Sequence, residues 1–201
     1  YAKSFSWAGF FLPKKTLNKC STLYDFCRVV DNLADDDDEI KSKEIKFDLF
    51  EKDFNQKNFN NPIIKNMWDL IEEYNISLKI VRDLLVGIKS DIKETVKLGS
   101  KKDLLIYSYR VAGTVGLMMA KILRVSKKRS LKSAIDLGIA MQLTNISRDV
   151  IEDFEKKRSY INKNFEEISS TINLAETFYE SSFYSIRDIP ISFRFSILVA
   201  R

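Results

Sequence analysis

The stretch that decides the fold lies at residues 24–35 and reads YDFCRVVDNLAD. Its apolar residues recur every three or four positions, as do those of the segment before it, and this period predicts an amphipathic helix from about Pro13 to Asp35. Asp31 and Asp35 are four residues apart, so they lie on the same face of that helix. Like charges at this spacing repel each other, and a bound cation would relieve the repulsion.

A second stretch repeats the arrangement at residues 142–153, which read QLTNISRDVIED. Asp149 and Asp153 are again four residues apart, and Gln142 and Asn145 share their helical face. The helix before them is apolar on most sides, so the two amides are polar groups in a buried setting and need partners there. Two carboxylate pairs that face each other across a cleft indicate Mg²⁺ and a polyphosphate substrate.

Each pair also has a purely structural interpretation. A single pair of aspartates four residues apart is more often a solvated helix face that lysines accompany. The run Asp36–Glu39 is interpreted in this way, as part of a surface loop that continues to Lys46. Two separate stripes, each with two aspartates, an arginine and neutral hydrogen-bonding groups, are much less expected by chance. Their combination therefore favours the functional interpretation.

Composition predicts one all-α domain. The chain has 201 residues, of which 45% are hydrophobic and 12% aromatic, with 6 glycines and 3 prolines. It is too apolar for a disordered segment and too poor in turn residues for a β-sandwich or barrel. The absence of histidine excludes histidine-based acid–base chemistry and most zinc or iron sites. Cys20 and Cys27 are too far apart on one predicted helix for a disulfide, which indicates a reducing compartment.

The charge pattern argues against nucleic acid as a partner. The net charge of +5 and the pI near 9.0 come from scattered lysines, with one tight basic cluster at residues 127–129 and no aromatic residues between them. A mild attraction to an anionic membrane surface remains an expectation. The best apolar run, Val111–Ala120, is too short to span a membrane. The chain begins at Tyr1 and stops at Arg201 within an apolar run, so both ends are expected to be cut.

The remaining helices follow from capping residues and periodicity. Gly113 and Gly116 lie inside one of them, and because each costs about 1 kcal/mol relative to alanine, they indicate close approach by a neighbouring element or a ligand. Ser130 is expected to cap the helix that reaches Asp153, and no strand pattern is apparent. The expected helices comprise residues 44–57 (a weak pattern), 62–74, 78–99, 101–123, 130–153, 171–187 and a segment that begins near Pro190.

Taken together, these segments resemble the squalene and phytoene synthase family. The resemblance rests on KSFS at residues 3–6, LP at 12–13, YSYRVAGTVG at 107–116 and the two aspartate stretches. The segments occur in the order that the family has, cover nearly the whole chain, and the long ones are highly specific. Within the family, the run VAGTVGLM at residues 111–118 is most similar to phytoene synthases.

The resemblance implies a single all-α domain over residues 1–201, incomplete at both ends, with the isoprenoid (terpenoid) synthase fold. This fold is a helical bundle around a central cavity, with the two aspartate motifs facing each other at its mouth. The resemblance also implies a prenyltransferase that condenses two geranylgeranyl diphosphates head to head to phytoene, through a cyclopropyl diphosphate and with release of diphosphate. Two alternatives stay open: a sister enzyme that makes squalene, dehydrosqualene or presqualene diphosphate from farnesyl diphosphate, and a non-catalytic helical assembly subunit.

The family's site residues are carried over by motif position. Mg²⁺ is the implied cofactor, with Mn²⁺ as an alternative, and the phytoene reaction needs no NADPH. The implied metal ligands are Asp31, Asp35, Asn145, Asp149 and Asp153. The implied catalytic residues are Arg28, Asp31, Asp35, Tyr107, Asp149 and Asp153. The implied substrate contacts are Ser4, Phe5, Tyr24, Arg28, Gln142, Asn145 and Arg148.

Three positions depart from the family pattern: Ile151 stands where glycine is usual, Asn32 where many members have aspartate, and Tyr1 where histidine is frequent. None of them removes an implied metal ligand, although each changes the expected shape of the cavity or the rate. The expected partners are prenyl diphosphates. The expected location is the cytoplasm with peripheral attachment to a membrane, because the product is insoluble in water, or the plastid in a plant or alga. The sequence leaves the oligomeric state open.

Overall fold

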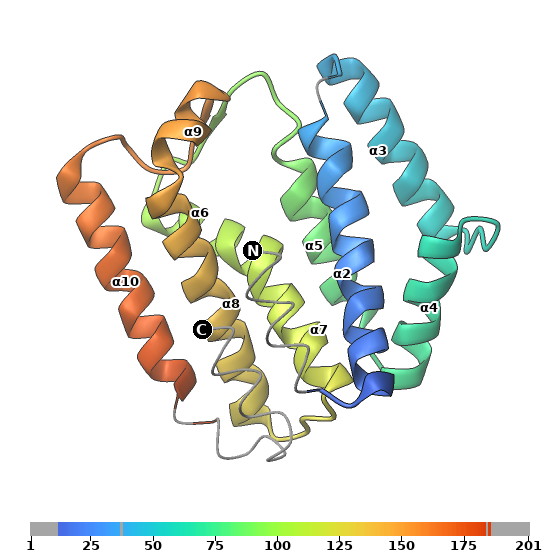
Figure 1. The fold of residues 1–201 in the computed structure, drawn as a ribbon. Coiled ribbons are helices and arrows are strands. Elements are labelled where there is room, and N and C mark those ends of the chain that lie inside the picture. Colours follow the sequence, from blue (N-terminus) through green and yellow to red (C-terminus); the bar gives the residue numbers. More distant parts are fainter. Residues whose placement is uncertain (1–11, 37, 184, 186–201) are drawn as a thin grey trace.

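Helices make up almost the whole of the fold, as the sequence predicts. The computed structural model describes residues 12–36, 38–183 and 185. Within these residues the helices lie side by side, with α10 at one edge and α3 and α4 at the other (Figure 1). The helices are α2 (Lys14–Asp35), α3 (Ile40–Asn55), α4 (Pro62–Tyr74), α5 (Leu78–Lys89), α6 (Lys101–Ser108), η1 (Tyr109–Gly113), α7 (Thr114–Ile122), α8 (Lys128–Arg148), α9 (Val150–Glu155) and α10 (Phe165–Phe183).

Several helix starts lie where capping residues predict them. The side chain of Asn61 accepts a hydrogen bond from the backbone N–H of Ile63 at 3.0 Å, and proline follows it as the first helical residue of α4. Ser77 accepts from the N–H of Lys79 at 3.3 Å at the start of α5. These bonds satisfy backbone donors that the first helical turn leaves without partners.

Other helix boundaries differ from the expectation. α3 begins at Ile40, so the loop expected to reach Lys46 ends at Glu39; three phenylalanines further along α3 are buried and hold the helix against the core. α5 ends at Lys89 and not near residue 99, because the hydroxyl of Ser90 donates to the Gly87 carbonyl at 2.6 Å and closes the last turn. Pro13 precedes the first residue of α2 and is not part of the helix.

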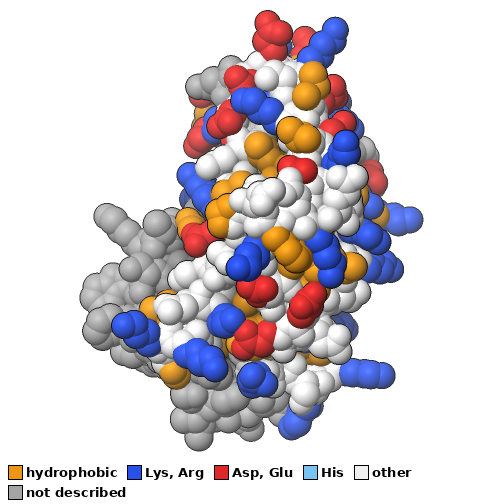
Figure 2. Space-filling model, turned by 90° about the vertical axis from the view of Figure 1, so that its right-hand side faces the viewer, with side chains coloured by type: hydrophobic (Ala, Val, Ile, Leu, Met, Phe, Trp, Pro, Cys, Tyr) orange, Lys and Arg blue, Asp and Glu red, His pale blue; other side chains and the backbone are white. Residues whose placement is uncertain are grey.

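An aromatic core fixes α2 against α3 and α4. Phe26 is fully buried, and its ring lies 5.7 Å from that of Phe54. Phe54 stacks on Trp68 at 5.4 Å, and the indole N–H of Trp68 donates to the Phe54 carbonyl at 3.0 Å. Because this packing buries one face of α3, its opposite face points to solvent, and Ile45 and Leu49 are exposed there among charged residues. Figure 2 shows that side of the molecule, where basic and acidic side chains are interspersed with small groups of hydrophobic side chains.

The helix expected at residues 101–123 is interrupted by a π-helical segment, η1, between α6 and α7. Gly116 lies against α8, where an added Cβ would be 2.2 Å from the Ala134 carbonyl oxygen. Gly138 of α8 in turn leaves room for the carbonyl oxygen of Ala112, which a Cβ would approach to 2.3 Å. The prediction that glycines here mark close approach is therefore confirmed, and the neighbour is α8.

A short parallel pair of strands contradicts the expectation of no strands. β1 (Val96–Lys97) pairs with β2 (Arg158–Ser159), with Val96 opposite Arg158. Backbone bonds of 3.0 Å from Val96 N–H to the Lys157 carbonyl and of 3.3 Å from Leu98 N–H to the Ser159 carbonyl form the ladder. The pair ties the segment after α5 to the segment after α9.

The helix that carries the second aspartate stretch also differs from its prediction. α8 begins at Lys128, so Ser130 lies inside it and is buried, and the helix breaks at Asp149 before α9. The backbone bond from the Asp153 N–H to the Asp149 carbonyl, 2.9 Å, keeps the one-turn relation across the break. α10 begins at Phe165, earlier than expected, and the segment expected near Pro190 lies outside the described residues.

Two further expectations concern cysteines and membranes. Cys20 and Cys27 are both free thiols, which confirms that they form no disulfide. Burial raises the pKa of Cys20 to about 11 and that of Cys27 to about 12, so both thiols stay protonated at neutral pH. None of the described helices combines the length and the apolar character needed to cross a membrane.

Candidate active site

The two aspartate stretches end at the same side of the bundle. α2 and α8 run in the same direction, so the end of α2 and the α8–α9 break both lie at the upper end in Figure 1. β2 follows α9 and brings Arg158 to this end of the molecule. The guanidinium Nη2 of Arg158 donates to Oδ1 of Asp35 at 2.7 Å, across 123 residues of sequence. This ion pair joins the first aspartate helix to the segment that follows the second.

The positive charge of Arg158 acts on both stretches. Burial raises the pKa of Asp31 on α2, of Asp153 on α9 and of Asp91 in the segment after α5, and the charge of Arg158 opposes this rise in all three. The Arg158 side chain is 15% exposed, whereas that of Asp35 is 47% exposed. Burial alone would lower the pKa of Arg158, but Tyr160 and Asp35 raise it, so the guanidinium remains charged.

The first carboxylate wall is formed by Asp31 and Asp35 on α2. Both residues are exposed, but the surrounding protein partly desolvates the Asp31 carboxylate. This desolvation, and next the charge of Asp35, raise the pKa of Asp31, while Arg28 and Arg158 act in the opposite direction. The repulsion expected from a spacing of four residues is thus present.

The second carboxylate wall is formed by Asp149 and Asp153. Partial burial, and with it the charge of Asp149, raises the pKa of Asp153 to about 6 against the lowering effect of Arg158. Asp149 is held by its neighbour Arg148, whose Nε donates to Oδ1 at 2.6 Å and whose Nη2 donates to Oδ2. This two-point pair orients the carboxylate and neutralises it.

The donor chemistry of the two walls fits a hard divalent cation. Carboxylate oxygens are the preferred ligands of Mg²⁺, and burial, together with the charge of the neighbouring aspartate, raises the pKa values of Asp31 and Asp153, an effect that a bound cation would oppose. Within the described ranges, however, no three acidic or cysteine side chains are grouped closely enough to hold a metal ion. The contacts to Arg148 and Arg158 occupy oxygens of Asp149 and Asp35. The metal-ligand set, which includes Asn145, therefore stays a prediction.

A tyrosine pair lies close to Arg158. Tyr107 at the end of α6 and Tyr160 after β2 stack with their ring centres 4.7 Å apart. The hydroxyl of Tyr107 donates to Oδ2 of Asp91 at 2.7 Å, and that of Tyr160 donates to Oδ1 at 2.9 Å. Burial raises the pKa of Asp91 to about 6 although these hydrogen bonds lower it. The arrangement fixes the hydroxyl of Tyr107 on Asp91 and Tyr160, and its catalytic role stays a prediction.

The other predicted substrate contacts are placed unevenly. Tyr24 and Arg28 are exposed on α2, and Gln142 and Asn145 are half-buried on α8. Ser4 and Phe5, together with the departure at Tyr1, lie outside the described residues. Ile151 is 56% exposed on α9, so its side chain does not fill the core.

Three residues of this end were not predicted from sequence: Asp91, Arg158 and Tyr160. Arg158 and Tyr160 follow Asp153 by five and seven residues, and the basic run that ends in Arg158 was a signal for a phosphate-binding segment. Asp91 had no signal, since it is an isolated carboxylate far in sequence from every motif.

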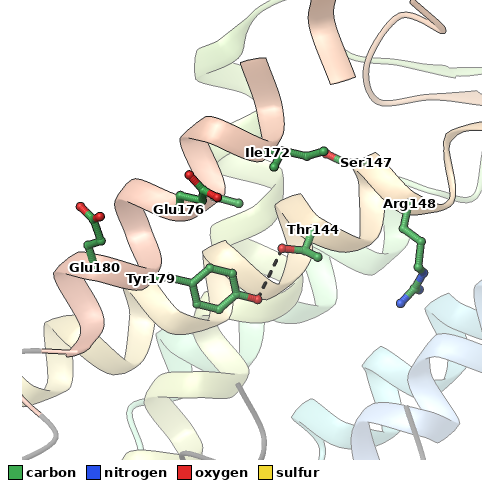
Figure 3. A pocket seen from close by; sticks show the side chains of 8 residues that line it. Thr144, Ser147, Arg148, Ile172, Glu176, Tyr179 and Glu180 are labelled. Carbon is green, nitrogen blue, oxygen red and sulfur yellow. Dashed lines mark hydrogen bonds between the residues drawn. The ribbon is translucent and has the colours of Figure 1, made fainter. Parts of the chain in front are cut away.

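A groove of about 630 Å³ opens between α8 and α10 (Figure 3). Thr144 and Tyr179 approach each other in it, with their hydroxyl oxygens 3.4 Å apart, and the acidic Glu176 and Glu180 lie on its α10 side. Of the predicted site residues, Arg148 lines this groove. None of the four aspartates lines the groove, so it is not a space between the two carboxylate walls, and the central cavity stays a prediction.

Comparisons with known proteins agree with this fold and identify the family. A family model described as squalene/phytoene synthase matches residues 1–165. The 15-cis-phytoene synthase of Enterobacter agglomerans is 34% identical over 171 residues, which are 80% of this chain and 58% of that protein. The chloroplastic phytoene synthase 1 of Zea mays is 30% identical over 170 residues, 80% of this chain and 41% of that protein. The chain spans about half the length of these two relatives.

Solved structures give the same result for the fold. A dehydrosqualene synthase crystallised in complex with a ligand superposes with a TM-score of 0.78 and 28% identity, over 98% of this chain and 77% of that one. A squalene synthase from Alicyclobacillus acidocaldarius superposes with a TM-score of 0.81 over 98% and 82%, and its 17% identity supports the fold alone. Since the family model covers most of the chain and the fold agrees, the chain belongs to the squalene/phytoene synthase family.

Proposed function

We propose that the protein of which this chain is part condenses two molecules of geranylgeranyl diphosphate head to head to phytoene and releases diphosphate. The observation that carries the proposal is that one largely enclosed arginine, Arg158, pairs with Asp35 and acts electrostatically on both Asp31 and Asp153. Relatives named phytoene synthase, at up to 34% identity, support this product over others.

The carboxylate walls would serve the departure of diphosphate. Asp31, Asp35, Asn145, Asp149 and Asp153 would hold the divalent ions. When bound, Mg²⁺ supplies positive charge that stabilises the leaving diphosphate as the allylic C–O bond breaks. The arginines of this end have planar, forked donors that suit phosphate oxygens, and their charge would favour the same step.

The chain's apolar and aromatic groups would serve the carbon side of the reaction. The first condensation leaves a cyclopropyl diphosphate, whose second ionisation and loss of a proton give phytoene. Tyr107 would lie beside the reacting carbons, with its hydroxyl turned to Asp91 and Tyr160 and thereby kept from capturing a carbocation. Exclusion of water from an apolar cavity would prevent hydrolysis of the same cation.

The first test removes one carboxylate from either wall. In the full-length protein, Asp31→Asn or Asp149→Asn is expected to lower Mg²⁺-dependent diphosphate release at least about a hundredfold. The reason is that the metal ion which stabilises the negative charge on the leaving diphosphate in the transition state would lose a ligand. Circular dichroism of each variant should match the wild type, since Asp31 is exposed and Asp149 is at a helix break. Near-normal release by either variant would show that the metal assignment is wrong.

A second candidate function is the condensation of farnesyl diphosphate to dehydrosqualene or squalene. It is favoured by the dehydrosqualene synthase structure, which covers nearly all of this chain at 28% identity. A competition between C15 and C20 diphosphates, with products identified by mass spectrometry, separates the two. A C40 hydrocarbon as the main product supports phytoene, and a C30 hydrocarbon supports the alternative. Binding of either diphosphate with no release of inorganic diphosphate would instead indicate a non-catalytic subunit.

A further inference from the structure

Arg158 is placed as a fixed positive charge between the two carboxylate walls. Its position is set by β2, which pairs with β1, and by the hydrogen bond to Asp35 at the end of α2. The guanidinium is largely enclosed, while its carboxylate partner is about half exposed. An enclosed cation on a short strand has little freedom to leave, whereas the exposed Asp35 can exchange its partner.

The charge of Arg158 already does part of what a divalent cation would do. It balances the charge of Asp35, which lies one helical turn from the like charge of Asp31. One carboxylate oxygen of Asp35, Oδ1, already accepts a hydrogen bond from the guanidinium. A metal ion that uses Asp35 must therefore displace this contact and must also bind close to a positive charge.

We propose that Arg158 is a built-in counter-ion that competes with the divalent cation for Asp35. The inference rests on the proposed function, because it takes Asp31 and Asp35 as part of a metal site. Arg158 holds the end of α2 against the segment after α9, and it weakens the binding of metal alone. A diphosphate, whose oxygens accept from a guanidinium, takes the place of Asp35 on Arg158, frees that carboxylate for the metal and thereby couples its own binding to that of the metal.

The counter-ion model predicts the sign of a mutational effect. In the full-length protein, Arg158→Gln is expected to bind Mn²⁺ alone about tenfold more tightly than the wild type, because one repelling charge and one competitor for Asp35 are removed. Mn²⁺ is the probe, and the loss of the free-ion signal in electron paramagnetic resonance measures its binding without substrate. A residue that merely braced the fold would give unchanged or weaker binding.

A second readout uses thermal stability. Without divalent ions, Arg158→Gln is expected to melt below the wild type, because the carboxylates lose their counter-ion. Addition of MgCl₂, against NaCl of equal ionic strength, should raise its melting temperature by more than it raises that of the wild type. Arg158→Lys keeps the positive charge but lacks the planar, two-pronged donor geometry of the guanidinium, and it should stay close to the wild type in both measurements.

Lys157→Gln is the matched control. It removes one positive charge at the adjacent residue, whose side chain is 66% exposed and reaches toward Glu94 at 3.8 Å. Its Mn²⁺ affinity should equal that of the wild type. Equal or weaker Mn²⁺ binding by Arg158→Gln, in a wild type that itself binds Mn²⁺, overturns the inference. A wild type that binds no Mn²⁺ would instead overturn the metal site of the proposed function.

Discussion

At the scale of single residues, Asp91 shows how a largely buried carboxylate is retained near Arg158. Both of its oxygens accept hydrogen bonds from tyrosines, and the charge of Arg158 also favours its ionised form. Burial outweighs these effects and raises its pKa to about 6. In the folded protein, Asp91 therefore takes up a proton at a pH where an unfolded chain has lost it.

The direction of the resulting pH dependence follows from that difference. Between about pH 4 and pH 6 the folded state binds more protons at Asp91 than the unfolded state, so the free energy of unfolding falls as the pH rises through this window. The shift from 3.8 to about 6 corresponds to at most about 3 kcal/mol. Asp91→Asn is expected to remove this part of the slope, which urea titrations at pH 4, 5, 6 and 7 can measure.

Asp153 titrates in the same direction, since its pKa is also raised to about 6. The quantity to compare is therefore the difference between the wild-type and Asp91→Asn slopes, in which the contribution of Asp153 cancels. Parallel slopes for the two proteins would contradict a raised pKa at Asp91. A change in stability that is the same at every pH reports only the altered hydrogen bonds to Tyr107 and Tyr160.

At the scale of elements, the contact between α7, η1 and α8 depends on glycine. Gly138→Ala would place a methyl group 2.3 Å from the Ala112 carbonyl oxygen, which belongs to the backbone and cannot move by itself. We expect a loss of about 1–3 kcal/mol or more in the free energy of unfolding, although alanine is the better helix former by about 1 kcal/mol. Chemical denaturation followed by circular dichroism measures the loss.

Gly99→Ala is the control for this substitution. Its added Cβ would meet only the Asp103 carboxylate at 3.5 Å, an ordinary contact. Its stability should lie within about 0.5 kcal/mol of the wild type. If Gly138→Ala were as stable as Gly99→Ala, the close approach of α8 to η1 would be wrong, and with it the position of Asn145 and Asp149 relative to Tyr107.

At the scale of the whole molecule, the two carboxylate walls come from distant parts of the chain. A divalent ion held by both walls binds the folded state only, so it should stabilise the protein by about 2.7 kcal/mol at one hundred times its dissociation constant. We expect MgCl₂ to raise the melting temperature of the full-length protein by several degrees over NaCl of equal ionic strength. Differential scanning fluorimetry measures the shift.

The same experiment on one-wall variants tests whether the walls act together. Asp31→Asn and Asp149→Asn should each lose most of the Mg²⁺-dependent shift, because an ion with ligands from a single wall binds weakly. Asp48→Asn changes an exposed carboxylate that pairs with Lys89 and belongs to neither wall, and should keep the shift. A full shift in either wall variant would argue against a shared site.

Local sequence was sufficient for most of the helical framework. The periodicity of residues 24–35 predicts α2, and Asn61 and Ser77 predict the starts of α4 and α5, because capping and amphipathic spacing are properties of a few adjacent residues. The same locality explains the errors. The start of α3 and the π-helical interruption at η1 depend on packing against other helices, which no local pattern records.

The sequence by itself determined the all-α class, the two aspartate stretches and the family, since each can be recognised from residues that are neighbours in the sequence. Only the tertiary structure decided that Arg158 would form a hydrogen bond to Asp35, and that Asp91 would accept hydrogen bonds from Tyr107 and Tyr160. These contacts join residues 16 to 123 positions apart. Such contacts depend on how the helices pack and where β1 meets β2, and both follow from the whole chain folding together.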